Sequence, residues 1–146
     1  MHWQAVPRLP WISKHLNVFA CIAQNVCNCI YKERTLKFSN LEVTENICKH
    51  SSIQESDDIT SLSISNSTIG QDTSLSNLLS SLNLLPSQIR RLSITNTDIS
   101  SISVNFLANL EYLDLRNNQL AVLKKLELPK LKQLYLSGNP WTCFIT

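Results

Sequence analysis

The stretch that decides the fold runs from residue 110 to residue 120 and reads LEYLDLRNNQL. Leu113 and Leu115 alternate with polar residues, so both side chains lie on one face of a short strand. A polar turn follows, and Leu120 then points back toward the same interior. Asn118 lies in that turn, where its amide can bond backbone groups of neighbouring coils that would otherwise be buried without partners. The stretch therefore predicts one coil of a stack, because a single coil cannot bury its own inner face.

The same spacing recurs in three other rows of the sequence. Rows that start at residues 89, 110 and 131 are 21 residues apart, whereas the row that starts at residue 59 precedes the next by 30. The Asn position holds Asn139 in the last row, but Ser67 and Thr97 in the first two, which have Asn66 and Asn96 one place earlier. The expected inward residues are Ile59, Leu62, Ile64 and Ile69; Ile89, Leu92, Ile94 and Ile99; Leu110, Leu113, Leu115 and Leu120; and Leu131, Leu134, Leu136 and Trp141.

This period and pattern resemble the leucine-rich repeat, L-x-x-L-x-L-x-x-N-x-L. The resemblance implies an α/β-type repeat solenoid: a horseshoe segment with short parallel strands on its concave face and irregular, 3-10 or helical segments on its convex side. Residues 59–141 would form about four repeats, with a long insert at 70–88. The leucines of that insert fit a short amphipathic helix or an extra, irregular coil, which Pro86 is expected to end. A plain core helix is a poor alternative, since strand-like alternation recurs at a fixed period.

Four cysteines precede the repeats and resemble the N-terminal cap of extracellular leucine-rich repeat proteins. This cap would span residues 21–58 and include a degenerate first repeat at Leu36, Phe38 and Val43. Spacing alone permits three pairings of four cysteines. The resemblance implies the pairs Cys21–Cys29 and Cys27–Cys48. Zinc binding is disfavoured, because the spacing is unusual and only one histidine lies nearby; reduced structural thiols in the cytosol are the other alternative.

Residues 1–20 are predicted to be a secretory signal peptide. Arg8 and Lys14 precede a short apolar stretch, and cleavage after Ala20 would keep all four cysteines. A poorly ordered leader or a mis-set start is the alternative. Asn66 begins the sequence Asn-Ser-Thr, an N-glycosylation acceptor that agrees with secretion.

Residues 139–146, NPWTCFIT, resemble the start of a C-terminal cysteine cap that is incomplete. Cys143 would then be a free thiol or form an intermolecular bridge, and the uncovered end could pair with a second copy as a homodimer. A membrane anchor would exist only in a C-terminal segment that this chain lacks.

Binding is predicted on the concave face, where residues between the inward ones point outward. Tyr and Arg are enriched at binding hot spots. The predicted ligand-binding residues are Arg91, Glu111, Tyr112, Asp114, Arg116, Lys132, Gln133 and Tyr135. Tyr112 and Tyr135 are expected to be neighbours that are slightly offset.

The predicted function is protein–protein recognition in adhesion, signalling or immunity, with a secreted or cell-surface location and a protein ligand. No motif for catalysis, a metal or a cofactor is present. Without its first twenty residues the chain has 11 basic and 11 acidic residues, which gives no footprint for nucleic acid. The alternatives are a cytoplasmic scaffold with reduced cysteines and a truncated product that has no independent function.

Overall fold

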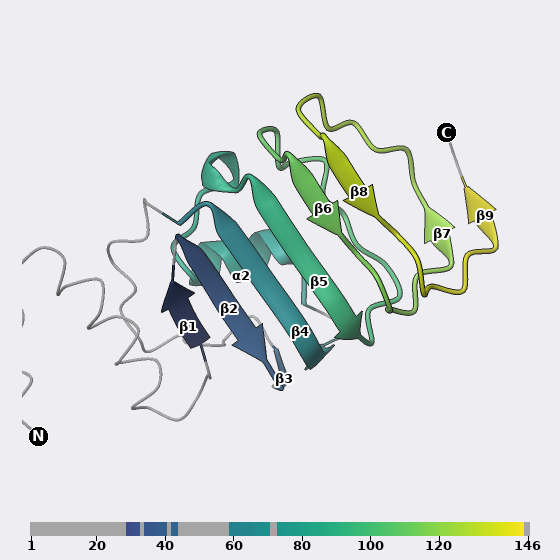
Figure 1. Ribbon diagram of the computed structural model, residues 1–146, viewed down its shortest axis with the longest axis horizontal. Coiled ribbons are helices and arrows are strands. Elements are labelled where there is room, and N and C mark those ends of the chain that lie inside the picture. The colour runs from purple at the N-terminus through teal and green to yellow at the C-terminus, as the bar shows by residue number, and fades with distance from the viewer. Residues whose placement is uncertain (1–28, 33, 41, 44–58, 71–72, 145–146) are drawn as a thin grey trace, which may run out of the picture.

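The chain forms a stack of coils, most of whose strands belong to one sheet (Figure 1). The computed structural model describes residues 29–32, 34–40, 42–43, 59–70 and 73–144. The main sheet runs in the order β1-β2-β4-β5-β6-β8, β3 pairs with β4, and a two-stranded sheet joins β7 to β9. The strands are β1 Cys29–Lys32, β2 Thr35–Ser39, β3 Glu42–Val43, β4 Ser61–Ile69, β5 Arg91–Thr97, β6 Tyr112–Asp114, β7 Val122–Leu123, β8 Gln133–Tyr135 and β9 Cys143–Phe144.

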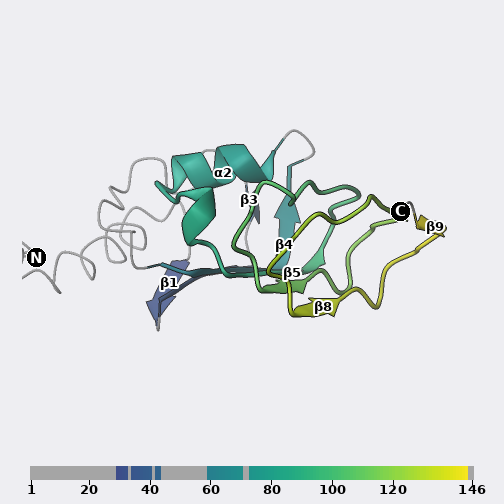
Figure 2. The same cartoon turned by 90° about the horizontal axis from the view of Figure 1, so that it is seen from above.

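The repeat positions align from coil to coil. Strands β2, β4, β5, β6 and β8 are parallel, and Leu92 stands beside Leu62 on one side and Leu113 on the other. Equivalent residues of neighbouring coils therefore stack into continuous apolar columns. Every inward residue of the first three rows is at most 9% exposed, which confirms the core that the sequence predicts. Figure 2 shows the return segments behind the sheet. The columns pack together with Leu78, Leu79 and Leu107 of these segments in one buried cluster.

One return segment is helical. The 30-residue first interval contains α2 (Leu75–Ser81), whose apolar side packs Leu75, Leu78 and Leu79 against the back of the sheet. Ser74 caps its start by accepting a hydrogen bond from the Asn77 N–H at 3.1 Å. The expectation that Pro86 ends this helix is wrong. The helix ends at Ser81, and Pro86 instead begins the 3-10 turn η2 (Pro86–Gln88), where its fixed φ suits the first position.

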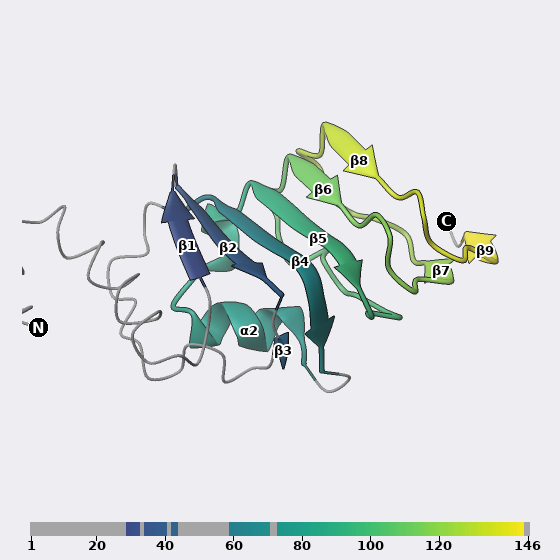
Figure 3. The ribbon, with the colours of Figure 1, turned by 60° about the horizontal axis from the view of Figure 1, so that its bottom comes forward.

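The degenerate row before the repeats joins the same stack (Figure 3). Leu36 pairs in register with Leu62, Phe38 pairs with Ile64, and both are at most 1% exposed. Strand β1 then runs antiparallel to β2 and forms the end of the sheet. Cys29 begins β1, whereas Cys21, Cys27 and Cys48 lie outside the described residues. The disulfide pairing therefore stays a prediction.

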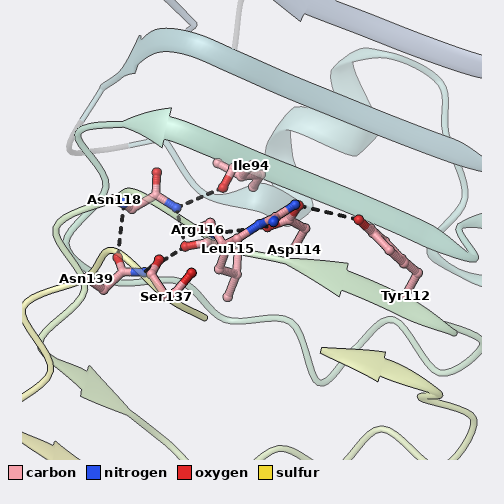
Figure 4. Close-up of polar contacts among 8 residues, drawn as sticks. All are labelled: Ile94, Tyr112, Asp114, Leu115, Arg116, Asn118, Ser137 and Asn139. Atoms are coloured by element: carbon pink, nitrogen blue, oxygen red, sulfur yellow. Dashed lines mark hydrogen bonds and ion pairs between the residues drawn. The ribbon is translucent and has the colours of Figure 1, made fainter. Parts of the chain in front are cut away.

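Two asparagine side chains join the later coils (Figure 4). Asn118 donates through Nδ2 to the carbonyl oxygens of Ile94 and Leu115, both at 2.8 Å. Its Oδ1 accepts from the Thr97 N–H at 3.0 Å and from the Thr97 hydroxyl at 2.6 Å. Asn139 repeats the pattern one coil later, donating to Leu115 at 2.8 Å and accepting from the Asn118 N–H at 3.1 Å. These bonds confirm the ladder role that the sequence predicts for both residues.

The asparagines of the earlier rows have a different role. Asn66 and Asn96 have φ of 50° and 52°, and the equivalent positions, Asn117 and Gly138, have φ of 60° and 74°. Asn and Gly tolerate this left-handed conformation better than other residues do. Asn66 and Asn96 thus hold left-handed positions within β4 and β5 and are not displaced ladder residues. Ser67 and Thr97 occupy the ladder position itself.

Replacing Gly138 with alanine should destabilise the last coil. Gly138 has a φ of +74°, and a Cβ at this position would clash with Asn117 Oδ1 and lie 3.1 Å from the Asn117 backbone nitrogen. We expect Gly138→Ala to lower the free energy of unfolding by about 1–2 kcal/mol. Gly138→Asn is the matched control, because it carries the same Cβ against Asn117 while asparagine accepts positive φ. A smaller loss in Gly138→Asn would therefore measure the contribution of φ alone. Urea unfolding followed by circular dichroism measures both, and equal losses would show that φ is not the cause.

The C-terminal end of the stack is only partly covered. Leu134 is 40% exposed and Tyr135 is 37% exposed, although Leu113, one coil earlier, is 0% exposed. Trp141 packs against the core cluster and donates through Nε1 to the Leu136 carbonyl at 2.8 Å. β8 is thus the edge of the main sheet, with apolar side chains open to solvent.

Candidate binding face on the parallel strands

The outward positions of the parallel strands form one surface, here called the strand face. Register places Ser61, Arg91, Tyr112 and Gln133 in one column across the coils. The next column contains Ser63, Ser93, Asp114 and Tyr135. The face thus has small hydroxyl residues on β4 and large aromatic and charged residues from β5 to β8. Its residues are Lys37, Ser61, Ser63, Ser65, Arg90, Arg91, Ser93, Thr95, Glu111, Tyr112, Asp114, Arg116, Lys132, Gln133 and Tyr135.

Two tyrosines and two arginines stack on the larger half of this face. The rings of Tyr112 and Tyr135 have centroids 5.5 Å apart and are tilted by 48°, which confirms that they are offset neighbours. The Arg91 guanidinium carbon lies 3.9 Å from the Tyr112 ring centroid, and that of Arg116 lies 4.9 Å from the Tyr135 centroid. Such cation–π contacts hold a guanidinium in place while its N–H groups stay available.

Asp114 lies beneath Arg116 and fixes it (Figure 4). The Arg116 Nη2 and Nε atoms donate to the two carboxylate oxygens at 2.7 and 2.9 Å, and the Tyr112 hydroxyl adds a 3.4 Å bond. Asp114 is only 3% exposed, so it supports the site more than it meets a ligand. Burial alone would raise the pKa of Asp114, but the hydrogen bonds and charge of Arg116 outweigh it, and the net pKa is lowered. Burial and then the charge of Asp114 raise the pKa of Tyr112.

The lowered pKa of Asp114 makes a pH prediction. Because the folded-state pKa lies below the unfolded value of about 3.9, the carboxylate stabilises the fold above that pH and loses this effect as pH falls through its folded pKa. Asp114→Asn should therefore lower the free energy of unfolding by on the order of 1 kcal/mol at pH 7, a modest value because Arg116 is partly exposed to solvent. The difference from wild type should shrink below about pH 4. Urea unfolding at pH 7, 4 and 2.5 measures it. A difference that stays constant with pH would contradict the assignment to ionised Asp114. The control is Glu127→Gln, which removes an exposed carboxylate that is in no ion pair with a described residue.

Charges border the face where the strands begin. Glu111 accepts from Arg90 at 2.9 Å and from Lys132 at 3.4 Å, and these bonds lower the pKa of Glu111. Arg91 differs from these residues, since it is in no ion pair with a described residue. The strand face as a whole carries five basic residues (Lys37, Arg90, Arg91, Arg116 and Lys132) and two acidic ones (Glu111 and Asp114).

The remaining predicted site residues lie apart or at the margin. Lys132 and Gln133 are exposed beside the tyrosines, and Asn66 is exposed within β4. Cys143 begins β9, away from the strand face. Ser61, Ser63 and Ser93 also lie on this face. Their alternation with buried Leu62, Ile64, Leu92 and Ile94 predicts that position, but the predicted set of ligand-binding residues did not include them.

The described part of the chain contains neither a metal cluster nor a membrane-spanning helix. No three His, Cys, Asp or Glu side chains gather there as a metal site. None of the helices described has the length and apolarity that a membrane crossing requires.

The last two coils match a known repeat. Residues 108–144 match the family of Leucine Rich repeats (2 copies), so the parallel sheet is that of a repeat α/β fold. Nephrocan from Mus musculus is 43% identical over 74 residues, a match that covers 46% of this chain and 14% of that relative. The chain therefore corresponds to a small part of Nephrocan's length.

Proposed function

We propose that this chain is a protein-recognition module that binds its ligand through the strand face, as a segment of a leucine-rich repeat horseshoe. One observation carries the proposal: Arg91 and Arg116 are each stacked on a tyrosine, and the two tyrosines contact each other. Such residues lose little side-chain freedom on binding, because their rotamers are already held. Tyr and Arg in a preordered cluster are typical hot-spot residues. The repeat match over residues 108–144, which contain Tyr112, Arg116 and Tyr135, supports the proposal.

The ligand surface is proposed to be acidic at one point and apolar beside it. The excess of basic residues on the strand face favours a negatively charged partner and speeds its encounter. Arg91 presents a guanidinium that has no carboxylate partner among the described residues, and it borders the Ser61 and Ser93 hydroxyls in the sheet. An Asp or Glu carboxylate of the ligand would accept hydrogen bonds from the Arg91 guanidinium, and the serine hydroxyls would donate further hydrogen bonds to the same carboxylate. The paired rings of Tyr112 and Tyr135 would pack against the adjacent apolar surface of the ligand.

Arg91→Ala is expected to weaken ligand binding at least tenfold, since a charge-assisted pair at a hot spot contributes about 1.5–3 kcal/mol. Arg90→Ala is the matched control: it removes the same residue type one position away, but Arg90 already pairs with Glu111. Its affinity should stay within about threefold of wild type. A binding screen of the immobilised chain against an array of folded protein domains, followed by surface plasmon resonance, measures both. Full affinity in both Arg91→Ala and Tyr112→Ala would place the ligand elsewhere.

We further propose that the module acts outside the cell, in adhesion, signalling or immune recognition. The Cys-x-Cys spacing, the signal peptide predicted at 1–20 and the glycosylation acceptor at Asn66 support this proposal. The Asn66 side chain is exposed, as a glycan requires. The uncovered apolar edge at β8 supports a homodimer through this end. The groups on the strand face are suited to binding, and we assign them no catalytic step. The alternative remains an intracellular scaffold with reduced cysteines.

Intact mass of the chain expressed in eukaryotic cells, with and without reduction and thiol labelling, tests the location. A secreted species that starts at Cys21 with two disulfides would support the capped extracellular module. A disulfide-linked dimer would make Cys143 its assembly device. Five labelled thiols in the lysate, with nothing secreted, would overturn the extracellular proposal in favour of the scaffold.

A further inference from the structure

A cleft of about 450 Å³ opens behind the sheet, on the opposite side from the strand face. It lies between three stretches, residues 73–78, 100–105 and 121–126. The cause is a change of coil length, from 30 residues in the first interval to 21 in the next. The long coil places α2 behind the sheet, whereas the shorter coils return without a helix (Figure 2). The return segments therefore do not close against each other at this step in the stack.

The floor of the cleft is made of branched aliphatic side chains. Ile69, Ile99 and Leu120 are the residues that return inward after each turn, and they line the cleft from three successive coils. Leu75 and Leu78 of α2 contribute one wall. Water gains few hydrogen bonds on such a surface, and apolar cavities of this kind stay dry or take up apolar molecules. The volume lies within the range of small-molecule sites.

The mouth of the cleft is polar and positively charged. Ser100 and Ser101 are exposed on one side, and Lys124 and Lys125 are exposed on the other. The Asn105 side chain holds the lysine segment in place, because its Nδ2 donates to the Lys125 carbonyl at 3.1 Å and its Oδ1 accepts from the Glu127 N–H at 2.8 Å. None of the residues that line the cleft in the described structure is acidic.

We propose that this cleft binds a single alkyl chain that ends in an anionic head group, such as a fatty acid. The chain would displace water from the aliphatic floor, which is the main source of binding free energy for such ligands. The head group would remain at the mouth, where Lys124 or Lys125 neutralises it and a serine hydroxyl donates to it. This site is separate from the strand face, so both ligands could bind at once.

Isothermal titration of the full 146-residue chain with laurate, below its micelle concentration, tests the proposal. Dodecanol and dodecyltrimethylammonium are the matched probes, with the same chain length but a neutral or a positive head. We expect one site for laurate, with affinity about tenfold weaker for dodecanol and weaker still for the cation. The absence of laurate binding to folded chain would overturn the proposal. Equal affinity for all three probes would overturn the role of the lysines.

Two sets of variants separate the cleft from other apolar surface. Ile102→Trp fills the cleft from a half-buried position and should reduce laurate affinity at least tenfold, whereas Leu85→Trp, at a 65% exposed position outside it, should leave affinity unchanged. The double change Lys124→Glu and Lys125→Glu should weaken laurate but not dodecanol, which keeps the test valid if Ile102→Trp fails to fold. Undiminished laurate binding in the folded Ile102→Trp chain would contradict the site. Loss of laurate binding with retained protein binding would show that the cleft and the strand face act independently.

Discussion

Replacing Asn118 with alanine is expected to lower the free energy of unfolding by about 3–4 kcal/mol, because the change leaves several buried backbone groups without partners. Asn118 is 1% exposed and bonds the backbone of Ile94, Thr97 and Leu115. Water cannot replace these bonds at such a depth, so each unpaired group carries its desolvation penalty. Urea unfolding monitored by circular dichroism, analysed as a two-state transition, gives the difference directly.

Comparison with Asn139→Ala separates the effect of burial on the loss of stability from the effect of the number of hydrogen bonds removed. Asn139 makes equivalent bonds one coil later, but it is half-buried at the end of the stack, where water can reach the groups it leaves. Its loss should be about 1–2 kcal/mol. Asn118→Asp should be at least as damaging as Asn118→Ala, since an oxygen would then face the Ile94 and Leu115 carbonyls. A loss below about 1 kcal/mol for Asn118→Ala would contradict the ladder as a source of stability.

The sequence predicted those features that the repeat itself determines. Leu62, Leu92 and Leu113 occupy the same repeat position, and each contacts its counterpart in the next coil. The spacing along the sequence therefore also predicts which residues of neighbouring coils are in contact. The Asn118 ladder and the offset of Tyr112 from Tyr135 follow from the same register.

The features that the sequence did not predict depend on contacts between residues at different positions of the repeat. Alternation places Asp114 on the outer face, but it does not show that Arg116 folds over the carboxylate and buries it. Spacing alone could not show whether an asparagine serves for its positive φ, as Asn66 does, or for the ladder bonds of its side chain, as Asn118 does. The cleft arises where a long coil meets a short one, and no single row of the sequence contains that difference.

The strand face depends on the uniform stacking behind it. Arg91 and Arg116 belong to different coils, and the distance between them is fixed by the ladder bonds and the apolar columns. A mutation in the core would therefore alter binding as well as stability, and binding variants such as Arg91→Ala need a check of unfolding free energy. Exposed strand-face substitutions should change stability little.

Leu113→Ala is expected to cost about 3 kcal/mol in free energy of unfolding, from lost burial and the cavity left behind. Leu113 is 0% exposed and lies between Leu92 and Leu134 in the central apolar column. Leu134→Ala removes the same atoms at the same repeat position, but Leu134 is 40% exposed, so its loss should be about 1 kcal/mol. The difference between the two losses therefore measures how much a covering coil adds to the stabilisation by a buried leucine.

The dependence of the Leu134→Ala loss on protein concentration then tests the proposed homodimer. In a monomer both losses are independent of concentration. If a second copy covers β8, Leu134 becomes buried in the dimer, and its alanine variant should lose more stability as concentration rises, by mass action. The loss for Leu113→Ala should not change in the same way, because its neighbours are within the chain. A small Leu134→Ala loss at every concentration would mean that the end of the stack remains open, and the dimer proposal would fail while the strand-face proposal stands.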